Sequence, residues 1–134
     1  EDIPAIGDYD GDGIVETAFE EFGTINDPVL GDTGLYGQLK AALAAQDPPI
    51  FYDPDTYPYF LTATGGTFRA WTTNTLSAAF NLSWAYQAGN CVPYHNAWYG
   101  AQILQDSLRA LGVDTSGYFR PDIFNRTAND YRLL

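Results

Sequence analysis

The chain has 134 residues, which is the size of one small domain with a single hydrophobic core. Seventeen acidic residues against six lysines and arginines give a formal net charge of −11 at pH 7. Such a charge is repelled by nucleic-acid phosphates and by anionic membrane surfaces. No apolar run in the sequence is long enough to span a bilayer. We therefore expect one domain, residues 1–134, with neither nucleic acid as a partner nor a membrane span.

The composition and the first residues favour an extracellular protein. The chain is rich in tyrosine and phenylalanine, has no methionine, and contains one cysteine, Cys91, which cannot form an internal disulfide. It opens at EDIPAIG, without an initiator methionine, a charged start or an apolar stretch. This is the expected beginning of a secreted, mature chain whose signal peptide has been removed.

The first 22 residues predict an extended arm followed by a calcium loop. Residues 1–6 are expected to be extended, since Pro4 disfavours a helix. In the next segment, GDYDGDGIVETAFEEF (residues 7–22), three aspartates alternate with other residues. Carboxylates this close repel one another unless a cation lies between them. The spacing Asp-x-Asp-x-Asp-Gly is the first half of an EF-hand-type loop, whose ligands are hard oxygen atoms suited to calcium.

The second half of the loop departs from an EF-hand. Phe19 occupies the position at which an EF-hand has its bidentate glutamate, so another acidic residue is needed to complete the shell. The predicted metal ligands are Asp8, Asp10, Asp12, the carbonyl of Ile14, Glu16, and either Glu20 or Glu21. The alternative is a solvated Asp-Gly turn without a metal. A single loop without a paired partner indicates a structural clamp rather than a sensor.

The rest of the chain is expected to be mainly α-helical, with three main helices at residues 34–46, 67–89 and 95–112. The faces at helical spacing are expected to be Leu35, Leu39 and Leu43 in the first helix and Leu76, Phe80 and Trp84, with Ala79 and Ser83 beside them, in the second. In the third helix the face is Trp98, Ala101, Leu104, Leu108 and Leu111. A short helix over residues 15–22 is expected to leave the calcium loop. The proline- and aromatic-rich segments between helices are expected to form long ordered loops or extended strands.

Five segments, in chain order, form a distinctive series: DYDGDGIVE, YGQLKAALAAQ, PPIFYDPDTYPYF, FRAWTTNTLSAAFN and YHNAWYGAQILQDSLRALG. Together they resemble the haem-free C-terminal region of large secreted multihaem c-type cytochromes of bacteria and archaea. The resemblance implies a calcium-stabilised accessory domain that carries no electrons itself. No CxxCH haem-attachment motif occurs in the sequence, and the second acidic loop that the family often has after YPYF is replaced by LTATGGTF.

Other chemistries find little support in the sequence. CVPYH (residues 91–95) lacks the second cysteine of a haem-attachment motif, so Cys91 is expected to be a small buried side chain. His95 and Asn96 are expected to cap the start of the third helix. His95 is the only histidine, and no nucleophile motif or phosphate-binding glycine loop accompanies it. Adjacent Glu20 and Glu21 would point apart on a helix, so the chain is not expected to be an enzyme.

These observations predict an extracellular calcium-binding structural protein that self-associates, as the subunit of a filament or another homopolymer. The N-terminal arm is a candidate for docking on a neighbouring copy. The alternative is a calcium-stabilised carbohydrate-binding or adhesion module. This alternative rests on FYDPDTYPYF (residues 51–60), where five aromatic rings in ten residues are a plausible stacking surface for a polysaccharide.

Overall fold

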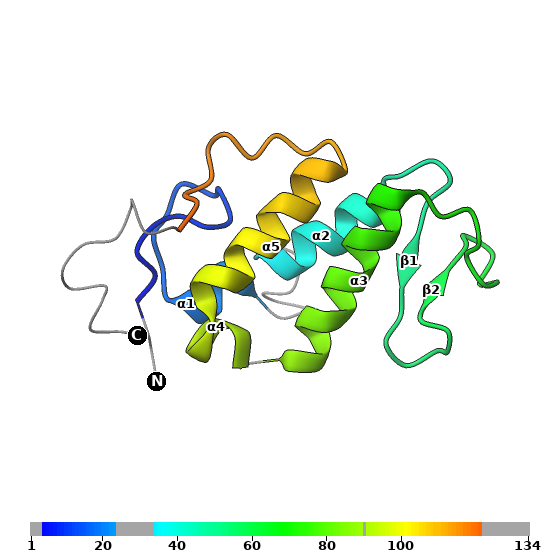
Figure 1. Cartoon of the computed structure of the whole chain (residues 1–134), viewed down its shortest axis with the longest axis horizontal. Coiled ribbons are helices and arrows are strands. Elements are labelled where there is room, and N and C mark those ends of the chain that lie inside the picture. The colour runs from blue at the N-terminus through cyan, green and yellow to red at the C-terminus, as the bar shows by residue number, and fades with distance from the viewer. Residues whose placement is uncertain (1–3, 24–33, 90, 122–134) are drawn as a thin grey trace.

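A computed structural model describes residues 4–23, 34–89 and 91–121, and the prediction of a mainly helical protein is confirmed. Within these residues there are five helices and one two-stranded sheet (Figure 1). In chain order they are α1 (Ala18–Phe22), α2 (Leu35–Ala44), β1 (Phe51–Tyr52), β2 (Phe60–Leu61), α3 (Thr73–Ala88), α4 (Cys91–His95) and α5 (Ala97–Ala110). No helix in the described part of the chain is long and apolar enough to cross a membrane.

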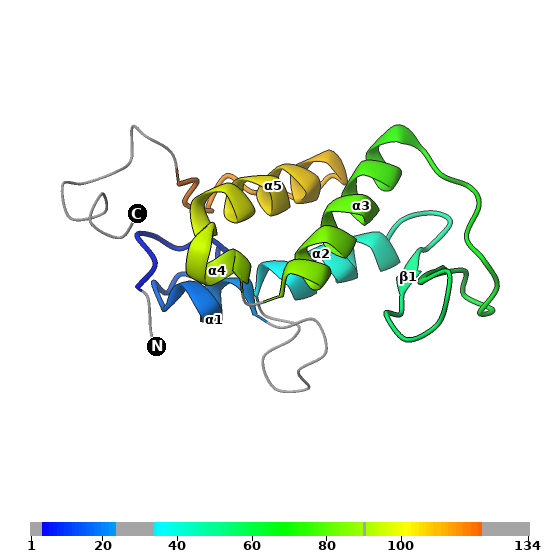
Figure 2. The same ribbon diagram turned by 60° about the horizontal axis from the view of Figure 1, so that its bottom comes forward.

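The core lies among α2, α3 and α5, which pack against one another in the middle of the molecule (Figure 2). The predicted faces of two of these helices are correct. Leu35, Leu39 and Leu43 of α2 are completely buried, as are Ala101, Leu104 and Leu108 of α5. At the start of α5, Gly100 permits close packing, because a Cβ there would lie 2.3 Å from Val92 of α4.

The predicted face of α3 is wrong in its three large residues, although the neighbouring Ala79 is buried. Leu76 and Phe80, expected inside, are 53% and 71% exposed, and Trp84 is only half-buried. The buried face instead consists of Thr75, Ala78, Ala79, Leu82 and Ala85. Small alanine side chains let this helix approach α2 and α5 closely, and the resulting tight packing leaves the larger side chains outside. Both faces repeat at helical spacing, so periodicity alone did not distinguish them.

The proline-rich segment forms a hairpin at one end of the molecule. Strands β1 and β2 are antiparallel, with Phe51 opposite Leu61 and Tyr52 opposite Phe60. Tyr52 is buried and its ring lies 4.9 Å from that of Phe60. Tyr57 and Phe51 are exposed. The segment therefore contributes one ring to the core and presents others to solvent.

Residues 4–6 of the predicted arm pack against the same chain. Pro4 forms a bridge with Thr17, and the Ala5 amide donates to the Glu16 carbonyl at 3.1 Å. Ala5 is buried, and Ile6 packs on the core. This part of the arm is thus held by its own domain, while residues 1–3 lie outside the described residues.

Two smaller predictions around α4 are also wrong. Cys91 is exposed rather than buried. His95 ends α4 instead of starting the next helix, and the Asn96 side chain makes no capping hydrogen bond at the start of α5. Asn96 does occupy the N-cap position of α5, as predicted, but Cys91 and His95 belong to the extra short helix α4, which the sequence pattern did not indicate.

The orientation of α3 predicts different costs for two identical substitutions. Leu82→Ala should lower the free energy of unfolding by about 2–5 kcal/mol, because it leaves a cavity in the core. Leu76→Ala, on the exposed side of the same helix, should change it by no more than about 0.5 kcal/mol. Urea unfolding of dilute protein, followed by circular dichroism, measures both. Equal losses, or a larger loss for Leu76→Ala, would contradict this orientation.

Candidate metal centre

The aspartates of the predicted loop hold its backbone in a tight turn. Asp8 accepts hydrogen bonds from the amides of Gly11 (2.7 Å), Asp12 (3.1 Å) and Gly13 (2.8 Å). Asp12 accepts one from the Ile14 amide at 2.8 Å. Gly11 and Gly13 have φ angles of +77° and +92°, which favour glycine because a side chain would be strained there. The alternating Asp-Gly pattern therefore encodes a specific loop conformation.

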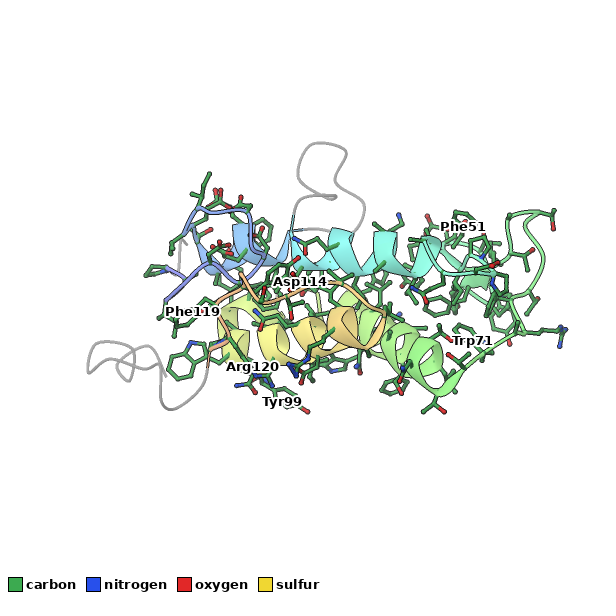
Figure 3. The ribbon with its side chains drawn as sticks, turned by 90° about the horizontal axis from the view of Figure 1, so that it is seen from above. Phe51, Trp71, Tyr99, Asp114, Phe119 and Arg120 are labelled. Carbon is green, nitrogen blue, oxygen red and sulfur yellow. The ribbon has the colours of Figure 1, made fainter. Side chains whose placement is uncertain are left out.

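The loop is fastened to the helical core through three consecutive carbonyls, those of residues 8–10. The first accepts from the Phe119 amide at 2.7 Å, the second from the Gln105 side chain of α5 at 2.9 Å, and the third from the Gln38 side chain of α2 at 2.7 Å. Figure 3 shows Phe119 beside the loop. Gln105 is buried, and it also donates to the Phe119 carbonyl at 2.9 Å. Two helices and the segment after α5 thus meet at this loop.

Helix α1 places the side chain of Glu21 on the inner side of the loop. Thr17 caps α1 in a capping box with Glu20, whose carboxylate accepts from the Thr17 amide and hydroxyl. The next residue, Glu21, is completely buried. Its carboxylate accepts hydrogen bonds from the amides of Tyr9 (2.8 Å), Asp10 (3.2 Å) and Glu16 (3.0 Å).

Three carboxylates converge at this point, namely those of Asp8, Asp10 and Glu21. Each offers one oxygen, and these oxygens all lie within 4.8 Å of one another. Calcium binds oxygens at about 2.3–2.6 Å, so two ligands of one ion lie no more than about 5 Å apart. Asp10 and Glu21 are buried, and Asp8 is half-buried. One cation could therefore contact all three carboxylates, and each of them offers a hard oxygen donor.

Burial makes negative charge costly here. The pKa of Asp10 is raised to about 8, first by burial and then by the neighbouring carboxylates of Glu21, Asp8 and Asp12, although the Asp12 amide partly offsets this. Burial also raises the pKa of Glu21, against the opposing effect of its three amide donors. A bound proton or a cation would relieve this cost.

The structure brings together some of the predicted ligands and leaves others apart. Asp8, Asp10 and Glu21 form the cluster, whereas Glu20 is occupied in the capping box. The other predicted ligands lie on the rim: Asp12 and Ile14 are exposed, and Glu16 is half-buried. Burial, followed by the charges of Asp12, Glu20 and Asp8, raises the pKa of Glu16. The negative charge of the neighbouring carboxylates therefore also acts on this residue.

Sequence reasoning missed the side chains that position the loop. Gln38, Gln105 and Phe119 were not predicted to belong to the site. Gln105 carried a detectable signal, because it is a polar residue that adjoins Leu104 and lies three positions before Leu108, on the apolar side of α5. A buried amide of this kind needs hydrogen-bond partners, and here the loop supplies them.

Comparison with known proteins gave no match for this chain, whether to a protein-family model, a curated protein or a solved structure.

The raised pKa of Asp10 predicts the pH dependence of stability without divalent cations. The folded-state pKa is about 8 and the ordinary value is 3.8. Between these values the folded chain holds a proton that the unfolded chain has released, so this group's contribution to stability is lost as the pH rises from about 4 to 8. Asp10→Asn removes the titration. In the presence of a chelator the variant should be more stable than the parent at pH 8, with little difference at pH 4.

Asp12→Asn is the matched control, since it removes an exposed charge two residues away. Its difference from the parent should vary less with pH. Urea unfolding at pH 4, 6 and 8 in chelator measures the three proteins. A difference between Asp10→Asn and the parent that stays constant with pH would contradict the assignment of the raised pKa.

Proposed function

We propose that this chain is an extracellular calcium-binding structural protein that assembles with copies of itself and has no catalytic activity. The observation that carries the proposal is the convergence of Asp8, Asp10 and Glu21, two of them buried, at the turn of an Asp-x-Asp-x-Asp-Gly loop. The resemblance to the haem-free region of secreted multihaem cytochromes agrees with an extracellular, calcium-stabilised domain.

Calcium fits this set of donors better than other common cations. The three carboxylates provide oxygen only, whereas zinc prefers nitrogen and sulfur ligands. Magnesium demands a stricter octahedral shell and retains water more strongly. In our proposal Asp8, Asp10 and Glu21 hold the ion, and the rim residues Asp12, Ile14 (through its carbonyl) and Glu16 supply further oxygens.

The role of the ion in this proposal is to clamp the fold. The loop is bonded to α2, to α5 and to Phe119, and its inner carboxylate comes from α1. A cation that removes the repulsion among the carboxylates stabilises all these connections together. Electrostatic repulsion opposes the same connections when the cation is absent.

Calcium binding is tested by titration calorimetry and thermal unfolding of two adjacent variants. Calcium should raise the free energy of unfolding by about 2.7 kcal/mol when its free concentration is one hundred times the Kd. Glu21→Gln should lose most of this effect, because it removes a clustered carboxylate. Glu20→Gln should retain it, since glutamine also fits a capping box.

The calcium site is wrong if the parent protein gives no binding heat and its melting temperature is the same in calcium and in chelator. If calcium binds but Glu20→Gln abolishes binding while Glu21→Gln does not, the ligand is Glu20 and the assigned cluster is wrong. Magnesium at the same concentration serves as the cation control.

Self-assembly is the second part of the proposal. Six basic against 17 acidic residues leave the monomer strongly negative, so copies repel one another over a Debye length of about 8 Å at physiological salt. Association therefore needs an apolar contact large enough to overcome this repulsion. Large exposed side chains such as Leu76, Phe80 and Tyr99 provide apolar surface for such a contact.

Sedimentation velocity over a range of concentrations, together with negative-stain images, measures assembly of the full chain. With saturating calcium we expect species larger than the monomer that increase with concentration. A monomer at all accessible concentrations would contradict self-assembly while leaving the calcium site intact.

The exposed ring of Tyr57 favours the alternative, a carbohydrate-binding or adhesion module. Tyr57 is 82% exposed, and its ring lies 5.6 Å from that of Tyr59 in an edge-on arrangement. Exposed aromatic rings near carboxylates such as that of Asp53 are suited to a polysaccharide. If the protein is monomeric and polysaccharide retards it in a native gel, and if Tyr57→Ala abolishes this retardation, the alternative takes first place.

A further inference from the structure

An apolar stripe runs along the outer side of α3. Leu76, Phe80 and Trp84 are spaced four residues apart, so they lie above one another on a single face of the helix. Leu76 and Phe80 are 53% and 71% exposed. Tyr99 of α5, which is 55% exposed, extends the stripe, because its ring lies 6.2 Å from that of Trp84. Figure 3 shows Tyr99 on the outer side of α5. We call these four residues the α3 stripe.

The α3 stripe lies in the part of the chain that contains no acidic residues. All seventeen aspartates and glutamates fall outside residues 56–105, and this stretch of fifty residues contains only one arginine, Arg69, and no lysine. Helix α3 itself has no charged side chain. The metal-binding loop lies at the other end of the molecule from the hairpin, with the long helices between them (Figure 1). The helix that carries most of the stripe therefore adds no negative charge of its own to this face.

This distribution of charge restricts which partner fits the stripe. A cationic partner is drawn to clustered carboxylates such as those of the acidic loop rather than to an uncharged helix. A copy of this chain carries the same charge of −11, so its approach is favoured only where both surfaces lack carboxylates. Among the described residues, α3 provides an apolar face of this kind, and polar uncharged side chains such as Thr73, Ser77 and Gln87 border it. An apolar centre with a polar rim is the usual anatomy of a protein interface.

The size of the stripe is appropriate for the centre of such a contact. A fully buried aromatic side chain covers roughly 150–250 Å². The exposed portions of Phe80, Tyr99 and Leu76 therefore present several hundred Å², which is about the largest apolar patch that a monomer usually leaves open. A standard interface covers about 800 Å² on each partner, so the contact must also include the polar residues that border the stripe.

We propose that the α3 stripe is the surface through which two copies of this chain associate. This inference rests on the self-assembly proposed above and assigns it a place on the molecule. Phe80 is the central contact, since it has the largest exposed fraction in the stripe and lies between Leu76 and Trp84. Aromatic residues at the centre of an interface contribute most to its affinity.

Sedimentation velocity of the full chain, with saturating calcium and a reducing agent that keeps the exposed Cys91 from forming intermolecular disulfides, tests the proposal. Phe80→Glu places a carboxylate in the stripe and should weaken association by roughly tenfold or more. Phe80→Gln removes the apolar ring without adding charge and should also weaken it, though less. Tyr57→Glu is the matched control, because Tyr57 is still more exposed but lies on the hairpin. It should associate like the parent.

Circular dichroism and calcium calorimetry establish that each variant is folded. If the parent associates and both Phe80 variants associate equally well, the α3 stripe is not the interface and the inference is overturned. If Tyr57→Glu abolishes association while Phe80→Glu does not, the hairpin is the interface instead. If the parent protein remains monomeric, the proposed self-assembly and this inference are both overturned. If the parent associates but the Phe80 variants do so equally well, only this inference is overturned.

Discussion

The burial of two carboxylates beside a third is the constraint on which the rest of this structure depends. Asp10 and Glu21 are removed from water, and Asp8 adds a further oxygen within 4.8 Å. Three backbone amides bind the Glu21 carboxylate, yet burial still raises its pKa. Hydrogen bonds alone therefore do not offset the cost of placing the charges together, and either a proton or a cation relieves it.

The same loop also organises the helices around it. Gln38 and Gln105 reach it from α2 and α5, so two helices that pack together in the core also share hydrogen bonds to adjacent loop carbonyls. Close approach depends on glycine: a Cβ at Gly11 would lie 2.2 Å from the Tyr118 ring, and one at Gly7 would lie 2.1 Å from the Phe119 ring. The conformation of the loop and the packing of the segment after α5 are thus parts of one arrangement.

The sequence was informative where one physical requirement acted alone. Leucine spacing in α2 had one consistent solution, and three alternating aspartates followed by Gly13 predicted a tight acidic turn. The sequence was ambiguous where two structural arrangements fitted the same residue pattern. Helix α3 offers a small-residue face and a large-residue face, and close packing against two helices selects the small one. Glu20 and Glu21 were equivalent by spacing until the Thr17 cap fixed which of them turns inward.

The excess of acidic residues affects both the acidic loop and any contact between copies of the chain. A calcium ion adds two positive charges, so it changes the formal charge only from −11 to about −9. Calcium therefore relieves repulsion inside the loop, where the carboxylates are within a few ångströms, far more than it relieves repulsion between copies. In the proposed assembly the contact lies on the side of α3 that carries Leu76 and Phe80, because this helix has no charged side chain. In these proposals a cation reduces repulsion among the carboxylates of the loop, whereas the uncharged outer face of α3 avoids repulsion between copies.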